Sequence, residues 1–296
     1  MPNLKLNETP IRTARNYNIN NIELENIELP KSISQFKNVS ITGVEYTNNI
    51  NTNNLIYGLS KTLENQVKQN SNQKIKMQVQ NNENAQIDFK FDNQNTELVE
   101  NIEIVAEEKS QGAITIKYES TEEVEAYHNG IINIIAKPNS NLNIIIVNLM
   151  NTNSNNFLSI QNTLEGNAKV TYWIIDFGGK NSITNYYSNL KGGSSENNIN
   201  TIYLGKEEQQ FDLNYITHLQ GEKTKVNIEV QGALTDKAKK NFKGTIDFKK
   251  GSKKAIRKRR RSMHLTIKHS KIKSPTNATM LRRRCTRKPQ HKHTEK

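Results

Sequence analysis

The feature that most constrains this chain is a change to period-two hydrophobicity at about Lys74. From there, apolar residues alternate with polar ones in four successive segments. The alternating apolar residues are Ile75, Met77 and Val79; Ile87, Phe89 and Phe91; Ile102, Ile104 and Ala106; and Ile114, Ile116 and Tyr118. Side chains along a β-strand point to opposite faces in turn, so each segment is expected to form a half-buried strand.

Denser apolar runs follow, with turn residues between them. The runs are Ile131–Ala136, Leu142–Met150, Val170–Phe177, Ile199–Leu204, Val226–Val230 and Thr245–Phe248, and the turns contain Pro138-Asn139, Glu165-Gly166-Asn167, Gly178-Gly179 and Lys191-Gly192-Gly193. Short strands with almost no helix between them predict a sandwich, a barrel or a β-helix. Asparagine recurs near the strand ends. It favours the β-helix, because it tolerates the left-handed conformation and its amide can stack between successive coils.

The composition agrees with an elongated, repetitive β structure. Only 33% of the residues are hydrophobic and 6% are aromatic, which is less than in an average globular protein. No apolar stretch reaches eighteen residues, so no membrane span is expected, and Met1–Arg15 lacks the apolar core of a signal peptide. Cys285 is the only cysteine. A disulfide within the chain is therefore impossible, and a cytoplasmic location is expected.

Residues 1–73 are expected to form an extended arm and a short helix. Six apolar residues could dock the arm onto a larger body: Leu4, Leu6, Ile22, Leu24, Ile27 and Leu29. Between Asn54 and Asn70 four apolar residues recur at helical spacing: Leu55, Leu59, Leu63 and Val67. That spacing predicts one apolar face of an amphipathic helix, which would cover one end of a sheet.

Motifs typical of catalysis or of resident metals are missing. The chain has no glycine-rich phosphate loop, no His-Glu-x-x-His and no Cys-x-x-Cys. Before residue 257 the only histidines are His128 and His218, ninety residues apart, and each is interpreted as a structural or surface residue. The pairs Glu122-Glu123 and Glu207-Glu208 are interpreted as solvated turn charges. These absences favour a binding or scaffold protein over an enzyme, and no catalytic residue is predicted.

A series of short motifs runs through residues 162–255 in a fixed order. They are Leu164-Glu-Gly-Asn-Ala-Lys-Val-Thr-Tyr172, Gly178-Gly-Lys-Asn181, Asn185-Tyr-Tyr187, Tyr203-Leu-Gly205, Gln209-Gln-Phe-Asp212, His218, Gly232-Ala-Leu-Thr-Asp-Lys-Ala238 and Phe242-Lys-Gly-Thr-Ile246. In this order and spacing the segment resembles the SufB/SufD family of iron–sulfur cluster assembly proteins. Glu8-Thr-Pro-Ile-Arg-Thr13 and His128-Asn-Gly130 are also similar to stretches of that family.

The resemblance implies a mainly β fold: a right-handed parallel β-helix over residues 74–256, with a small N-terminal helical and extended segment. It also implies a non-enzymatic subunit of a cytoplasmic scaffold complex, which pairs with a SufB-type paralogue and binds a SufC-type ATPase. The short N-terminal region, and a body without cysteine, favour the SufD type over the SufB type.

Site residues also follow from the resemblance. Members of the family hold sulfur and iron with Cys, His and carboxylate groups. No stably bound cofactor or metal is expected, but a transient Fe–S cluster is implied at a subunit interface. His218 and Asp212 lie in a stretch similar to the family, so they are the candidate cluster-contacting residues.

The last forty residues differ sharply from the rest of the chain. Residues 257–296 contain 15 of the 42 Lys and Arg residues but only one of the 29 Asp and Glu residues, Glu295. We expect this tail to be disordered, because it has too little apolar surface to offset the entropy of ordering.

A frameshift would explain the tail. If permitted codons are read one base later, Arg282–Gln290 can spell Glu-Glu-Asp-Val-Gln-Gly-Asn-His, a motif that resembles the family. We therefore interpret the tail as the product of a frameshift near residues 251–257. It would remove the native C-terminal strands and helices, the histidine of that motif and the SufC-docking surface.

Two other functions stay open. Arg257–Arg261 and Arg282–Arg284 could neutralise the phosphates of a nucleic acid. However, residues 257–296 contain no Phe, Tyr or Trp for base stacking, so only non-specific contact is expected. The other alternative is an unrelated β-solenoid, such as a polysaccharide-binding β-helix. The missing signal peptide and the stretches similar to the family argue against it.

Overall fold

The computed structural model describes residues 3–9, 20–50 and 54–265 of the chain. Its elements are β1 Leu4–Leu6, β2 Ile22–Leu24, β3 Val39–Thr42, β4 Tyr46–Thr47, α1 Lys61–Asn70, β5 Gln73–Val79, β6 Asn82–Phe91, β7 Glu97–Ala106, β8 Gln111–Ser120, β9 Tyr127–Ala136, β10 Asn141–Leu149, β11 Asn155–Leu164, β12 Lys169–Asp176, β13 Asn181–Leu190, β14 Glu196–Gly205, β15 Gln210–Leu219, β16 Lys225–Leu234, β17 Lys239–Phe248 and β18 Ile256–Leu265.

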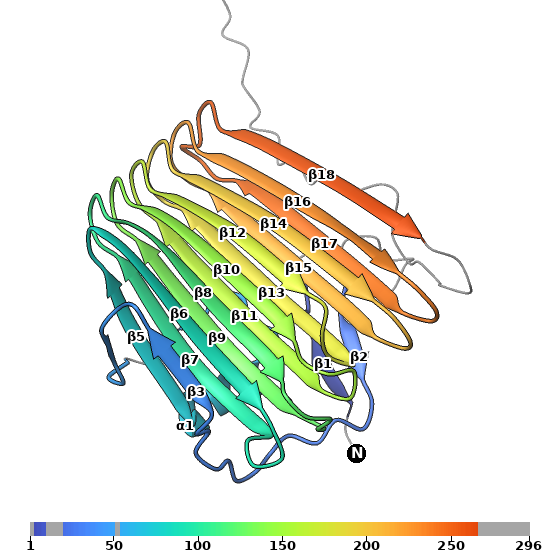
Figure 1. The fold of residues 1–296 in the computed structure, drawn as a ribbon. Helices are drawn as coiled ribbons and strands as arrows, with labels where there is room; N and C mark the ends of the chain where they lie inside the picture. Colours follow the sequence, from blue (N-terminus) through green and yellow to red (C-terminus); the bar gives the residue numbers. More distant parts are fainter. Residues whose placement is uncertain (1–2, 10–19, 51–53, 266–296) are drawn as a thin grey trace, which may run out of the picture.

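Two eight-stranded sheets make up most of the molecule (Figure 1). One, the even sheet, has the order β18-β16-β14-β12-β10-β8-β6-β3, and the other, the odd sheet, has the order β17-β15-β13-β11-β9-β7-β5-β4. From β5 to β18 successive strands alternate between the sheets, and all neighbours within a sheet are parallel. This is a parallel β-solenoid of about six turns, which confirms the predicted fold class. Its right-handed sense stays a prediction.

Each turn of the solenoid repeats the same corner. Asn181 pairs with Gln210 and Gln210 with Lys239, so a turn takes 29 residues there. The corner that leads from the odd to the even sheet has one non-glycine residue of positive φ in each turn: Asn81, Lys109, Asn139, Asn167, Ser194, Lys223 and Lys254. Asn167 Nδ2 donates to Asn139 Oδ1 at 3.1 Å. The predicted contact between asparagine amides of successive coils is thus present for one pair at this corner.

The hydrophobic core fills the space between the two sheets. In the even sheet one face is buried and the other is open, as the alternating pattern predicts. In β10, for example, Leu142, Ile144 and Ile146 are buried while Asn141 and Asn143 are exposed. Such a strand needs apolar residues on one face only, which explains how a chain with so few apolar residues can build this core.

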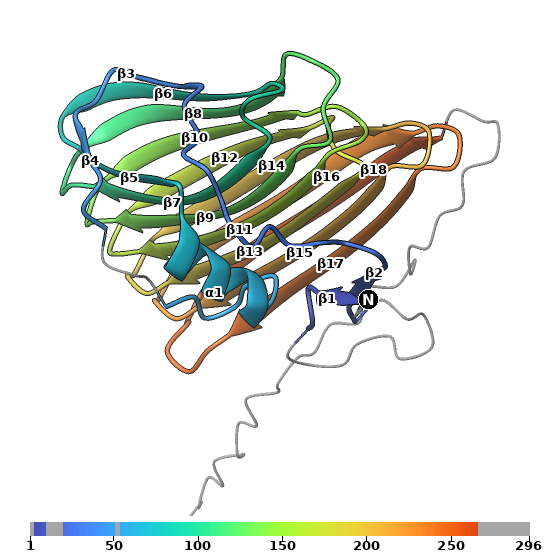
Figure 2. The ribbon, with the colours of Figure 1, turned by 90° about the horizontal axis from the view of Figure 1, so that it is seen from below.

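The middle strands of the odd sheet, β7 to β15, are buried on both faces, because the N-terminal segment packs across their outer side (Figure 2). Leu6 and Leu24 of the arm and Leu63 and Val67 of α1 form a second apolar cluster with outward residues of the odd sheet. Those outward residues are Val99, Tyr127, Ile131, Phe157 and Ile183. The prediction that apolar residues dock the arm onto the body is therefore confirmed.

Helix α1 starts later than the sequence predicts. The predicted helix begins near Asn54, whereas α1 begins at Lys61, with Ser60 as its N-cap. The Ser60 side chain accepts a hydrogen bond from Leu63 N, a bond typical of a helix start. Ahead of it, side chains of β11 bind the backbone, since Ile56 N donates to Gln161 Oε1 and Leu59 N to Ser159 Oγ. These contacts hold residues before Ser60 in an irregular conformation.

The two ends of the solenoid differ. At the first turn, β3 and β4 run antiparallel to β6 and β5 and close the sheets. At the last turn, β17 and β18 each bond to a single neighbour among the described residues. The pairing of β18 with β16 continues to Leu265, past the predicted end of the core at residue 256, and residues 266–296 lie outside the described part. Within the described chain no helix could cross a membrane.

Candidate functional site

The two candidate residues from the sequence, Asp212 and His218, lie on the same strand and face of the molecule. Both are on β15, at outward positions of the odd sheet. Six residues separate them, which at about 3.3 Å per residue places them roughly 20 Å apart. The structure therefore does not bring them into one site, and each has surroundings of its own.

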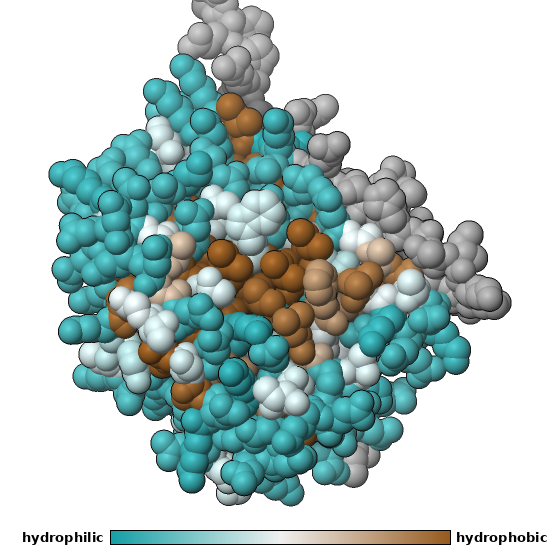
Figure 3. Space-filling view, viewed as in Figure 1, coloured by the Kyte–Doolittle hydropathy of each residue, from teal (hydrophilic) through white to brown (hydrophobic). Residues whose placement is uncertain are grey.

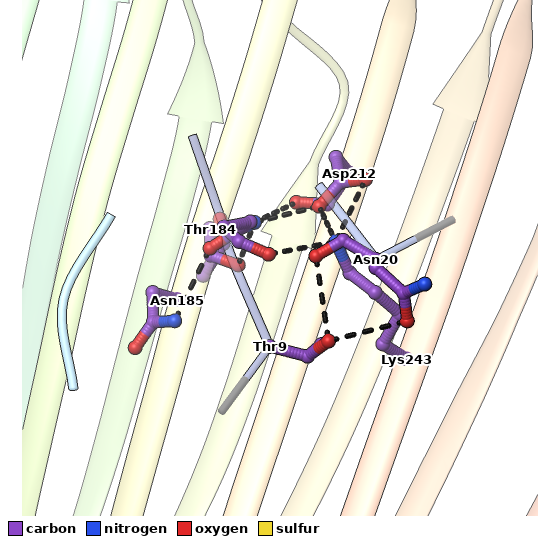
Figure 4. A network of polar contacts seen from close by, with 7 residues as sticks. Thr9, Asn20, Thr184, Asn185, Asp212 and Lys243 are labelled. Carbon is purple, nitrogen blue, oxygen red and sulfur yellow. Dashed lines mark hydrogen bonds and ion pairs between the residues drawn. The ribbon is translucent and has the colours of Figure 1, made fainter. Parts of the chain in front are cut away.

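Asp212 is fully buried in a polar cluster under the N-terminal arm (Figure 4). Lys243 Nζ of β17 lies 2.9 Å from Asp212 Oδ1, and Asn7 Nδ2 donates to the same oxygen at 2.7 Å. Lys243 also donates to the backbone oxygen of Asn7 at 3.2 Å, and Asn185 Nδ2 donates to Asn7 Oδ1 at 3.1 Å. Asn7 has a φ of 52°, which asparagine tolerates better than most residues.

This cluster fastens the arm to the last turns of the solenoid. The Asp212 carboxylate is paired with a cation and hydrogen-bonded, as a buried charge must be. Next to it the arm closes on itself, with Thr9 N donating to Asn20 O at 2.9 Å. With both Asp212 and Lys243 shielded from solvent, we interpret Asp212 as a structural anchor and not as a cluster ligand.

His218 lies near the other end of β15, against two tyrosines. Its ring centroid is 5.2 Å from that of Tyr187 and 5.9 Å from that of Tyr57. The Tyr187 hydroxyl is 3.2 Å from His218 Nδ1, and Asp247 Oδ2 of β17 is 3.8 Å from Nε2. Lys249 Nζ is 2.6 Å from the same Asp247 oxygen.

The surroundings of His218 favour the neutral imidazole. Burial lowers the pKa of His218 because it disfavours the charged ring, and the nearby Lys249 lowers it further, against the opposing pull of Asp247. A neutral imidazole is the form that can donate a lone pair to iron or another metal. In the described part of the chain, no three His, Cys, Asp or Glu side chains come together as a metal-binding group. His218 with Asp247 could therefore supply only part of a ligand set.

A chain of polar groups inside the solenoid is not predicted from the sequence. His128 and Glu100 point into the core from β9 and β7, and His128 Nε2 lies 3.4 Å from Glu100 Oε1. The Tyr118 hydroxyl donates to that Glu100 oxygen. On its other side His128 Nδ1 is 2.6 Å from Asn156 Oδ1, and Asn156 Nδ2 donates to Ser182 Oγ at 3.1 Å.

The chain of polar groups ends at a buried carboxyl group. Ser182 Oγ donates to Asp176 Oδ2 at 2.8 Å, and Asn148 Nδ2 donates to Asp176 Oδ1, also at 2.8 Å. Burial raises the pKa of Asp176 to about 6, although these two hydrogen bonds pull it down. Turn periodicity could have revealed this chain, because His128 and Asn156 are 28 residues apart and stand opposite each other in the register.

Comparisons with known proteins identify the family. Residues 89–274 match the family model described as "SUF system FeS cluster assembly, SufBD core domain". A search of the curated proteins found no match. The matched residues run from β6 to beyond β18 and cover most of the solenoid, together with His128, Asp212 and His218. Proteins of this family are scaffold-type components of iron–sulfur cluster assembly. The chain therefore belongs to the SufBD core family of the SUF system.

Proposed function

We propose that this chain is a SufD-type scaffold subunit without catalytic activity, which pairs with a SufB-type paralogue and works with a SufC-type ATPase. The observation that carries the proposal is the match of residues 89–274 to the SufBD core domain, which covers most of the solenoid. Since β3 and β4 close one end of the solenoid, the junction with the paralogue is placed at the other end, beside β17 and β18.

The assignment to the SufD type rests on the sequence. Residues 1–256 contain no cysteine. A subunit without its own thiolates cannot supply the sulfur ligands of a cluster. The paralogue would have to provide them.

The position of His218 fits a transient cluster at the subunit junction. β15, which carries His218, is the immediate neighbour of β17, the last described strand of the odd sheet, which carries Asp247. A neutral imidazole and a carboxylate at this end of the described solenoid could complete a ligand set whose sulfur comes from the partner. In this proposal the cluster is cargo, and His218 is the residue of this chain that contacts it.

We further propose that the end of this chain is out of frame and that the assembly function is impaired. The break in charge falls at Ile256–Arg257, within the first residues of β18. The β16 residues Val226, Ile228 and Val230 are buried core residues. Their register partners in β18 are Arg257, Arg259 and Arg261. Arginines at three apolar register positions break the pattern that earlier turns keep, as expected where a reading frame has slipped.

Co-expression tests this proposal. The chain as given and a chain with one base removed near codons 251–257 are each expressed with the SufB-type and SufC-type subunits. We expect the restored chain to purify with both, and the chain as given to lose the ATPase. The proposal fails if the restored chain binds neither subunit. If the genomic sequence across codons 245–260 is uninterrupted and in frame, the frameshift interpretation is wrong. The rest of the proposal does not depend on it.

A further inference from the structure

The outer face of the even sheet carries an exposed apolar surface in its middle (Figure 3). It lies on the C-terminal halves of β10, β12 and β14, whose outward residues are in register. We call it the even-sheet patch, and its members are Ile145, Val147, Leu149, Trp173, Ile175, Phe177, Ile202 and Leu204. Trp173 is 45% exposed and Leu204 is 47% exposed. Large apolar side chains grouped in this way on a protein surface mark an interaction site.

Polar strands limit the patch on both sides. On β8, Lys117 pairs with Glu119 at 2.6 Å, and on β16, Gln231 Nε2 donates to Glu229 Oε1 at 2.5 Å. Between β8 and β16, therefore, only β10, β12 and β14 are apolar on this face. At about 4.8 Å between strands the outer two are roughly 10 Å apart, which matches the 10–12 Å diameter of one α-helix.

The same limits argue against a second copy of this chain. Three strands by three outward positions make a patch of roughly 300 Å², whereas a standard interface buries about 800 Å² on each partner. Two such sheets packed face to face would also bring β8 and β16 together. Burying Lys117, Glu119 and Glu229 in that way would cost more than the patch gains.

The outer face of the odd sheet is covered by a helix, whereas the even-sheet patch has no such cover among the described residues. Helix α1 lies on the outer face of the odd sheet and packs Leu63 and Val67 with Val99, Tyr127 and Ile131. The outer side of this solenoid thus accepts an amphipathic helix where its outward residues are apolar. No described residue takes that place on the even-sheet patch, where Trp173, Phe177, Ile202 and Leu204 remain open to solvent.

We propose that the even-sheet patch binds one amphipathic α-helix of another subunit of the assembly complex. The helix runs along β12 and places apolar residues at positions i, i+3, i+4 and i+7 on the patch. Its polar face points to solvent between the paired charges of β8 and β16. The inference rests on the proposed function, since that function brings other subunits to this chain.

Trp173 provides the assay, because it is the only tryptophan of the chain. Its emission and its quenching by acrylamide are measured in the full chain, alone and with tryptophan-free SufB-type and SufC-type subunits. A 14-residue Leu/Lys peptide of the same helical spacing serves as a second probe. We expect emission to move to shorter wavelength and quenching to fall with the subunits and with the peptide. Leu204→Lys should weaken both contacts at least about tenfold, and Ile56→Lys, exposed on the other side, should not.

Each other outcome overturns the inference in a recognisable way. If the subunits bind the Leu204→Lys chain as well as the native chain and leave Trp173 open to quenching, they bind another surface and the inference is wrong. If no subunit binds, the proposed function fails, and an unbound peptide then rejects the helix site as well. If Trp173 becomes less accessible to acrylamide as the concentration of the chain alone rises, a second copy is the occupant. If a label on Cys285, the only cysteine, quenches the emission of Trp173, residues 266–296 of this chain are the occupant of the patch.

Discussion

Replacing Lys243 by methionine tests whether the buried cluster around Asp212 fastens the N-terminal arm. Methionine keeps most of the volume of the lysine stem but removes the ammonium group. The Asp212 carboxylate would stay buried, with Asn7 Nδ2 as a remaining side-chain donor at 2.7 Å. The arm would also lose the bond from Lys243 Nζ to the backbone oxygen of Asn7.

The expected cost follows from the burial of the pair. The two side chains are 3% and 0% exposed, with 2.9 Å between Nζ and Oδ1. Removing one partner of such a pair costs about 3–5 kcal/mol, because the other charge is left uncompensated. At about 2–4 °C per kcal/mol for a chain of this size class, the melting temperature should fall by roughly 6–20 °C.

Urea and thermal unfolding measure the effect. Lys237→Met is the matched control, since Lys237 pairs with Glu208 at 3.1 Å on the open surface, where such a pair contributes about 0–1 kcal/mol. Adding Asp212→Leu to Lys243→Met should recover part of the loss, because it removes the unpaired charge. The reasoning is refuted if Lys243→Met costs no more than Lys237→Met, or if the double variant is less stable than Lys243→Met.

Three further predictions concern other sites. The folded-state pKa of Asp176, about 6, lies above the ordinary aspartate pKa of 3.8. Between these values only the folded state holds the proton, so stability should fall by up to about 3 kcal/mol as pH rises from about 4 to 6. Urea melts should show the slope in the native chain and lose it in Asp176→Asn; an unchanged slope would assign it to another group. NMR titration should place the His218 pKa below 6.5, and Lys249→Met should raise it; a downward shift would contradict the assigned role of Lys249. Ser60→Ala should cost about 1 kcal/mol by removing the cap of α1, as measured by thermal melts; no loss would mean that the helix does not depend on this cap.

The even sheet could be predicted from the sequence, and much of the odd sheet could not. Strands such as β10 alternate apolar and polar residues, because one face meets the core and the other meets water. In β13, Asn181–Leu190, every residue is buried, and more than half are polar. Its outer face is covered by residues that come much earlier in the chain. No local period can show this, so β11, β13 and β15 gave no strand signal.

The candidate site shows the same limit. Asp212 lies in a stretch similar to the family, but its partner Asn7 is 205 residues away in the sequence. Its anchoring role therefore could not be predicted from the sequence. The sequence alone predicts a structural or surface role for His218, which is largely buried next to β17, the last described strand of the odd sheet. Its neighbours Tyr57 and Asp247 come from opposite ends of the chain. Only the coiling of the solenoid makes them neighbours.

The position of the arm has a consequence for synthesis on the ribosome. Asn7 leaves the ribosome early, but Lys243, to which it binds, is made 236 residues later. At about 5–20 residues per second this delay lasts roughly 12–47 s. During that time the apolar outer side of the growing odd sheet has no permanent cover at its newest turns. Nascent chains of this protein should therefore depend on holding chaperones until Lys243 has been made.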